Sequence, residues 1–322
     1  MADQLHSRPP VDPQCQTVLD AAANGGSAFQ KPTPQAMRVG YASMMETFAQ
    51  ATPELARVED LVVPASGSDP EVPIRVYHPP GIGDAAPGVI FMHGGGWVIG
   101  DLESHDAVCR TLAFRSDAVF VSVGYRLAPE HPFPAAPVDC ERATRFIADN
   151  AADFGIDPDR LALAGDSAGG NLAAVTARRL RDAGDGPAIV LQVLTYPATR
   201  FTAEGGSIEE NGTGYLLTKA TMDLFRGMYM PDAADWTHPD ASPLLAEDLS
   251  GLPPAFVQVA GYDPLRDEGV AYAGRLREAG VPVQMVEYPT MIHGFLRMGR
   301  VVSIAHVAMD DIAAALRRAF RG

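Results

Sequence analysis

Short apolar runs alternate with helix-compatible stretches along most of the chain. The apolar runs, typical of strands buried on both faces of a parallel sheet, are residues 88–92, 118–123, 161–164, 189–195 and 255–260. Between them lie segments such as residues 172–181, which lack Gly and Pro and favour a helix. The alternation predicts an α/β fold with a mostly parallel sheet that helices cover on both faces.

The two ends of this pattern predict strands of a different kind. Residues 58–63 and 72–78 look like two strands joined by the turn-rich segment 66–70. The last run, residues 281–288, contains Pro282, which cannot donate a ladder hydrogen bond, so this strand is expected at an edge of the sheet. Such an edge can pair with a second copy across a two-fold axis, which leaves a homodimer open.

Two segments depart from the alternation and are expected to cover the functional edge of the sheet. Residues 37–51 carry an apolar stripe at helical spacing, and residues 198–235 run through Gly-rich turns into another amphipathic helix. The stripe has two interpretations, packing against the core or a Met-rich wall for a ligand. We expect residues 1–55 and 198–235 to form a helical cap on a core of residues 56–197 and 236–322.

Charge and cysteine usage exclude several classes of function. The 322 residues carry a net charge of −15 with no Lys/Arg run, and such a surface repels nucleic acid and anionic membranes. Cys15, Cys109 and Cys140 are odd in number and widely spaced, which indicates free thiols and predicts a cytoplasmic protein. We find no metal-ligand spacing, no signal peptide pattern and no apolar stretch of membrane-spanning length. The lack of metal-ligand spacing leads us to expect no bound metal.

Residues Gly165-Asp166-Ser167-Ala168-Gly169 connect a predicted strand directly to a predicted helix. This is the context of the Gly-x-Ser-x-Gly elbow, which strains the backbone at the serine and exposes its hydroxyl. A plain Gly/Ser turn is the alternative, but the flanking strand and helix favour Ser167 as a nucleophile. At the helix N-terminus the free amide of Ala168 is well placed for an oxyanion. Asp166 is expected to brace the turn, with its side chain pointing away from the attacking oxygen.

A second glycine-rich segment follows another central strand. His93-Gly94-Gly95-Gly96-Trp97 comes directly after the apolar run 88–92, and three successive glycines are costly in backbone entropy. That cost is explained if backbone amides must approach a ligand closely. The alternative is an ordinary glycine loop. We predict that the amides of Gly94, Gly95 and Gly96 supply the other half of an oxyanion hole.

A serine nucleophile needs a base and a carboxylate that orients the base. Among the eight histidines, His293 follows the last strand in a short loop and is predicted to be the base. Asp263 follows a strand directly, whereas its rival Asp267 should lie one helical turn further on and point away. The order Ser167, Asp263, His293 is that of α/β-hydrolases, and in a parallel sheet all three fall at the carboxyl edge.

With these residues assembled, the sequence resembles the hormone-sensitive-lipase family of bacterial carboxylesterases, in the branch with Gly-Asp-Ser-Ala-Gly at the nucleophile. The strings that carry the resemblance are residues 93–97, 125–130, 133–136, 165–171, 207–211, 214–218, 263–267 and 293–295. The resemblance covers about residues 55–322. It departs at Gly124, where relatives often carry Asp, which bears on a supporting hydrogen bond and not on the triad.

The resemblance implies an α/β-hydrolase fold with an eight-stranded sheet and a helical cap. It also implies cofactor-free hydrolysis of short- to medium-chain acyl esters, with Gly95, Gly96 and Ala168 as oxyanion donors. The substrate pocket is expected to include Met37, Tyr41, Met44, Phe48, Trp97, Tyr196, Leu217 and Phe225. Two alternatives stay open: preference for amides or for acyl transfer to an alcohol, and a receptor that kept the fold but lost the chemistry. The complete triad disfavours the receptor.

Overall fold

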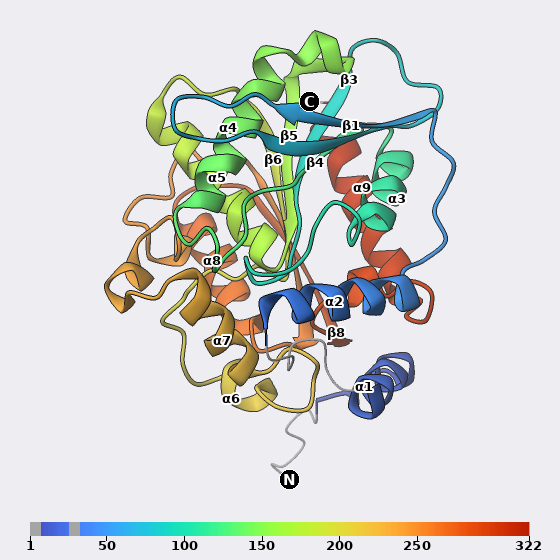
Figure 1. Cartoon of the computed structure of the whole chain (residues 1–322), viewed down its shortest axis with the longest axis vertical. Coiled ribbons are helices and arrows are strands. Elements are labelled where there is room, and N and C mark those ends of the chain that lie inside the picture. Colours follow the sequence, from blue (N-terminus) through green and yellow to red (C-terminus); the bar gives the residue numbers. More distant parts are fainter. Residues whose placement is uncertain (1–7, 26–32, 322) are drawn as a thin grey trace.

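The computed structural model describes residues 8–25 and 33–321, so residues 1–7 and 26–32 of the predicted cap segment lie outside the described residues. A single eight-stranded sheet runs through the molecule in the order β1-β2-β4-β3-β5-β6-β7-β8 (Figure 1). Its strands are β1 (Arg57–Val63), β2 (Val72–His78), β3 (Ala86–Met92), β4 (Val119–Val123), β5 (Ile156–Asp166), β6 (Ile189–Thr195), β7 (Ala255–Tyr262) and β8 (Val283–Ile292). Only the pairings of β1 with β2 and of β2 with β4 are antiparallel.

Helices cover both faces of this sheet. The α-helices of the described residues are α1 (Pro13–Gly25), α2 (Pro34–Phe48), α3 (Asp106–Ser116), α4 (Ala135–Asp149), α5 (Ala168–Ala183), α6 (Ser207–Asn211), α7 (Lys219–Tyr229), α8 (Arg266–Glu278) and α9 (Ile304–Ala319). One apolar cluster joins the sheet to α4, α5 and α8, and a second joins it to α3 and α9. Burial on both faces explains why the central strands are continuously apolar in sequence.

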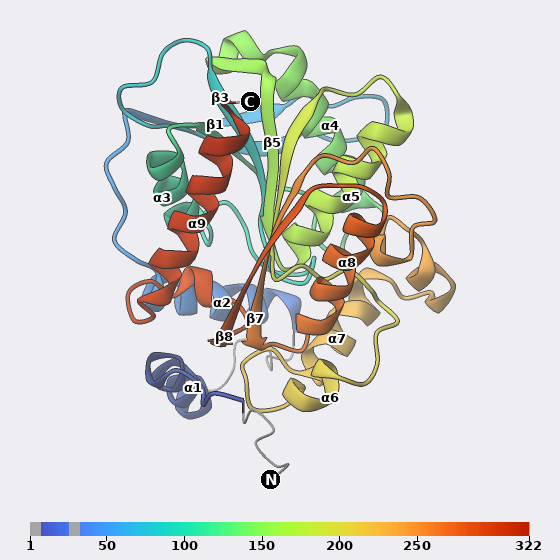
Figure 2. The same cartoon turned by 180° about the vertical axis from the view of Figure 1, so that it is seen from behind.

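The remaining helices gather at one end of the sheet. Both views show α1, α2, α6 and α7 at the lower end of the molecule, away from the C-terminus (Figures 1 and 2). Helix α2 begins after Thr33, whose hydroxyl accepts a hydrogen bond from the Ala36 amide, and α7 begins in the same way after Thr218. Segments distant in sequence therefore meet at this end.

The predicted edge strand is confirmed, since β8 closes the sheet order. It extends to Ile292, four residues beyond the predicted end, and a register shift interrupts its pairing with β7 near Gly261. Strand β5 starts at Ile156, whereas the sequence predicts its start at Leu161. The difference arises because residues 157–160, Asp-Pro-Asp-Arg, contain no apolar residue of the kind that marks a buried strand. The short helix α6 was not predicted, since five residues carry too little periodicity.

Candidate active site

The turn after β5 holds Ser167 in an unusual backbone conformation, with φ 57° and ψ −120°. A non-glycine residue reaches this region only when its surroundings enforce it. The Ser167 amide donates to the Thr195 carbonyl at 2.9 Å, which fixes the turn against β6. A side chain at Gly165 would collide with the Gly169 carbonyl, and one at Gly169 would collide with the Met92 carbonyl. Both glycines are therefore required by the close approach of α5 to the sheet.

A chain of hydrogen bonds leads away from the Ser167 hydroxyl. Ser167 Oγ donates to His293 Nε2 at 2.9 Å, and His293 Nδ1 donates to Asp263 Oδ2 at 2.7 Å. The other carboxylate oxygen of the fully buried Asp263 accepts from the Leu265 amide at 2.8 Å. Asp267 accepts instead from the Ser207 amide and so does not compete for His293. The structure thus brings the three predicted triad side chains together in sequence order Ser, Asp, His.

The glycine loop, residues 93–97, contributes some of its glycines to the pocket that contains Ser167, but not all of them. The Gly94 amide donates to Asp166 Oδ1 at 2.9 Å, so the prediction of Gly94 as an oxyanion donor is wrong: its only N–H is already used. Gly95 (φ 129°) and Gly96 (φ 59°) line the pocket beside Ser167, and within the described residues neither amide donates to another backbone carbonyl. Ala168 also lines the pocket. It is the first residue of α5, so its amide has no helical carbonyl to which it could donate a hydrogen bond.

Asp166 holds the glycine loop through the hydrogen bond that its carboxylate accepts from the Gly94 amide. It is 1% exposed, and His105 Nε2 and Arg297 Nε lie 3.2 and 3.4 Å from its two oxygens. Burial by itself raises the pKa of Asp166, but His105 and the Gly94 amide outweigh burial and hold that pKa below its usual value. Burial lowers the pKa of Arg297 to about 9, so its guanidinium is still protonated at neutral pH. The bracing predicted for Asp166 is thus an ionic contact within the core.

A pocket opens above Ser167, and four of the predicted lining residues belong to it: Tyr41, Trp97, Leu217 and Phe225. Met37, Met44, Phe48 and Tyr196 do not line it. The three α2 residues pack into the core clusters, because the stripe of α2 faces the sheet and only Tyr41 reaches the pocket. Tyr196 packs against the His293 ring at 4.8 Å instead. For these positions the packing interpretation holds.

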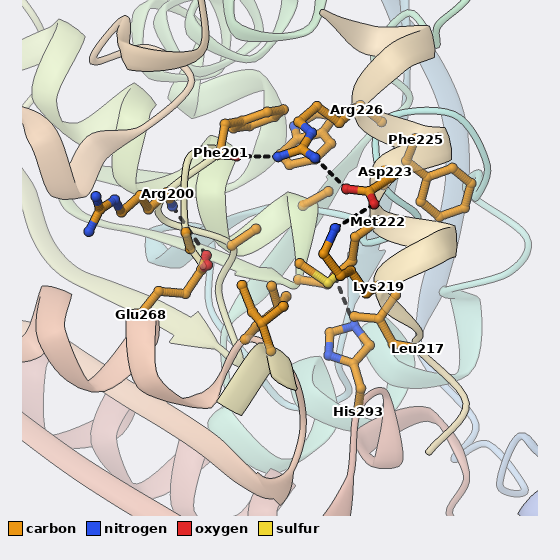
Figure 3. A pocket seen from close by; sticks show the side chains of 18 of the residues that line it. Arg200, Phe201, Leu217, Lys219, Met222, Asp223, Phe225, Arg226, Glu268 and His293 are labelled. Carbon is orange, nitrogen blue, oxygen red and sulfur yellow. Dashed lines mark hydrogen bonds and ion pairs between the residues drawn. The ribbon is translucent and has the colours of Figure 1, made fainter. Parts of the chain in front are cut away.

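Sequence reasoning missed several lining residues. The apolar ones are Ala198, Phe201, Ala203, Ile208 and Leu265, and Met222 of the amphipathic helix predicted within residues 198–235 lines the pocket as well. Figure 3 shows Leu217, Met222 and Phe225 on one side of the pocket, Glu268 on the other and His293 below them. Most of the missed residues lie in segment 198–235, whose irregular backbone gives no periodic signal. The resemblance of residues 207–211 to a family insertion was the one available hint.

Glu268 adds a buried carboxyl to the pocket wall. It is 6% exposed, and its Oε1 accepts from the amides of Thr199 and Arg200, at the start of segment 198–235. Burial raises the pKa of Glu268 to about 8. The carboxyl is therefore largely protonated at neutral pH, and it ties α8 to the first residues of that segment.

Comparison with known proteins agrees with this geometry. The alpha/beta hydrolase fold family matches residues 89–297. Carboxylesterase NlhH of Mycobacterium tuberculosis is 41% identical over 328 aligned residues, covering 99% of each chain. An arylesterase of Saccharolobus solfataricus is 38% identical over 92% of this chain and 96% of its own. The chain belongs to the α/β-hydrolase family, in its hormone-sensitive-lipase-like group of carboxylesterases.

Solved structures give the same result for the fold. An ester hydrolase from the metagenome of Lake Arreo, in complex with a bipyridine phosphonate derivative, is 44% identical with a TM-score of 0.91 and covers 97% of this chain and 100% of its own. A Pyrobaculum calidifontis esterase is 41% identical with a TM-score of 0.89, over 96% and 99% of the two chains.

Among the described residues, no helix has the length and apolarity that a membrane crossing requires.

Proposed function

We propose that this chain hydrolyses esters of short- to medium-chain carboxylic acids by acyl transfer through Ser167. The observation that carries the proposal is the hydrogen-bond chain from Ser167 through His293 to Asp263, at the base of a pocket lined by the Gly95, Gly96 and Ala168 residues. A nucleophile, a base and unpaired amides around one point are the groups that acyl transfer requires.

In the proposed cycle Ser167 Oγ attacks the ester carbonyl carbon while His293 Nε2 takes the hydroxyl proton. The carbonyl electron pair moves to oxygen, and this oxyanion accepts hydrogen bonds from the Gly95, Gly96 and Ala168 amides. Collapse expels the alkoxide, which receives the proton from His293. Water then attacks the acyl-enzyme by the same route, releasing the acid and restoring Ser167. Asp263 orients the imidazole and stabilises its charged form throughout.

We also propose that residues 1–55 and 198–235 act as a cap on the hydrolase core and set the acyl-length preference. The proposal is supported by the close packing of α7 on the glycine loop, where a side chain at Gly96 would collide with the Phe225 ring. Met222 of the same helix and Ile208 of α6 continue this apolar wall. Each methylene buried there contributes about 0.8 kcal/mol, or roughly fourfold in binding, so the depth of the wall selects chain length.

Turnover of p-nitrophenyl esters from acetyl to dodecanoyl tests the proposal. The wild-type protein should prefer acyl chains between acetyl and octanoyl, and Ser167→Ala should lose at least about 10³-fold in kcat with an unchanged circular dichroism spectrum. Ser167→Ala with near wild-type turnover would contradict the proposed nucleophile. A maximum at dodecanoyl would contradict the proposed acyl range alone.

The partner and location proposals rest on simpler features. The edge position of β8 supports a homodimer paired through this strand, for which sedimentation equilibrium should give twice the chain mass. The mass of one chain would contradict it.

Three buried free cysteines support a cytoplasmic location, which cell fractionation checks.

A further inference from the structure

We propose that Asn211, at the end of α6, is a positioning residue that holds the backbone carrying Asp263 in register with His293, and that Arg8 holds Asn211 in turn. The inference rests on the proposed role of Asp263. It assigns segment 198–235 a part in assembling the triad as well as in shaping the pocket. The residues concerned come from three separate stretches of the chain.

Asn211 contacts the strand exit on both sides of Tyr262. Its side chain is fully buried, and Nδ2 donates to the Gly261 carbonyl at 3.3 Å and to the Asp263 carbonyl at 3.1 Å. The two hydrogens of one amide group thus pair with two backbone acceptors. This is the place where the register between β7 and β8 shifts, so strand pairing alone does not fix the backbone there.

Arg8 determines which way the Asn211 amide faces. Arg8 Nη1 donates to Asn211 Oδ1 at 2.8 Å, and Nη2 donates to the Gly261 carbonyl. Because Oδ1 is occupied by a cationic donor, Nδ2 must point toward the two carbonyls. The Arg8 guanidinium also lies 3.4 Å from the Tyr262 ring centroid, and the Tyr262 hydroxyl donates to the Pro9 carbonyl at 2.6 Å.

The other end of α6 contacts the same loop beyond Asp263. The Ser207 amide donates to Asp267 Oδ2 at 2.9 Å, and the Ser207 hydroxyl donates to the Pro264 carbonyl at 2.8 Å. Helix α6 therefore binds residues on both sides of Asp263. Ile208, between these two anchor points, lines the pocket, so one short helix contacts both the substrate space and the acid loop.

The backbone position matters because the Asp263 carboxylate has little freedom of its own. One oxygen accepts from the Leu265 amide and the other from His293, both within 2.8 Å. A shift of the backbone therefore passes directly to the His293 ring. Misplacement of a catalytic group by about 1 Å costs on the order of 10²-fold in rate.

Asn211→Leu and Asn211→Asp test the proposal. Leu keeps the size and loses both donors, and Asp keeps the acceptor for Arg8 but turns an oxygen toward the two carbonyls. Each should lower kcat for butyryl ester by about 10- to 100-fold while KM stays within about twofold. The downfield proton NMR resonance of the His293 Nδ1–H should shift or broaden, which a loss of general stability would not cause in the folded protein. Glu209→Gln, on the exposed side of the same helix, should change neither.

A wild-type kcat and an unshifted resonance in Asn211→Leu would overturn the proposal. Should that variant fail to fold, Arg8→Met decides, because Arg8 is exposed and its loss leaves the core intact. Its kcat should fall about 3- to 10-fold with a shifted resonance, and wild-type values would again overturn the proposal. Ser167→Ala separates this test from the proposed function: activity surviving in that variant would refute the Ser167 mechanism whatever Asn211 does.

Discussion

The two loops that meet at Ser167 are held in opposite ways. The glycine loop is fixed by residues of the proposed hydrolase core itself, namely Asp166 and its buried partners His105 and Arg297. The acid loop, residues 261–267, is fixed largely by residues of the proposed cap segment 198–235, among them Asn211. On our proposals, the oxyanion hole is therefore held by the hydrolase core, whereas the placement of Asp263 depends on segments that also shape the pocket.

This difference has an energetic consequence. Removing one member of a buried ion pair leaves an unpaired charge and costs about 3–5 kcal/mol of stability. Exposed pairs such as Arg266 with Glu210, whose glutamate side chain is 53% exposed, contribute less than about 1 kcal/mol. Substitution of Asp166 beneath the glycine loop should therefore reduce stability and activity together, whereas loss of the exposed pair of Arg266 with Glu210 should leave stability nearly unchanged.

The largest effect is expected from Asp166→Ala. It frees the Gly94 amide and leaves Arg297 buried without a counter-charge. Because the released loop no longer holds the amides of Gly95 and Gly96 in place, we expect kcat to fall by about 10²- to 10³-fold, as for the loss of one oxyanion donor. The free energy of unfolding should fall by about 3–5 kcal/mol. Urea unfolding and ester turnover measure the two. Glu210→Ala is the matched control on the acid-loop side and should stay within about 1 kcal/mol of wild type.

If Asp166→Ala lost activity but no stability, Arg297 would not depend on Asp166 for compensation of its charge. If Glu210→Ala were as destabilising as Asp166→Ala, the contrast between the two loops would be refuted.

A smaller effect, on the acyl-length preference, is expected where α7 packs against the glycine loop. Phe225→Ala removes the ring that lies against Gly96 and should shift the preferred acyl length upward by one or two steps of the ester series, each methylene being worth about fourfold in kcat/KM. Phe225→Trp should shift it downward. Leu224→Ala, at a neighbouring position that is 40% exposed, is the control and should leave the profile unchanged. An unchanged profile in Phe225→Ala would remove this helix from the acyl site.

The smallest effect concerns Glu268 and pH. Its pKa is about 8 in the folded protein against an ordinary 4.5, so between these values the folded state binds more protons than the unfolded state. Stability contributed by this group is therefore present below pH 4.5 and is lost as pH rises toward 8. Glu268→Gln cannot lose a proton, so its Tm should fall less than that of wild type between pH 5 and pH 8.5. Parallel Tm curves would show that Glu268 does not titrate in this range.

The sequence predicts the sheet and the meeting of Ser167, Asp263 and His293 because each of these features has a local signal. Apolar runs mark the strands, and each triad residue follows a strand whose carboxyl end reaches the same edge. Gly94 was assigned wrongly because its amide pairs with Asp166, 72 residues away, and nothing local reveals that bond.

The proposed cap was harder to predict for the same reason. The α2 stripe is equally compatible with core and pocket, and only tertiary packing decides that Tyr41 lines the pocket while Met37 packs in the apolar core. The contact of Arg8 with Asn211 joins residues 203 apart in sequence, with no periodicity or motif to indicate it.

Peptide mapping after reaction with a fluorophosphonate tests most directly whether both loops serve Ser167. The reagent needs an activated hydroxyl with a base and oxyanion donors beside it, so the adduct should appear on Ser167 alone. Its rate of formation should fall in both Asp166→Ala and Asn211→Leu, and the label should be absent from Ser167→Ala. An adduct on Ser104, Ser122 or any other serine, or an unchanged rate in both loop variants, would contradict this arrangement of the active site.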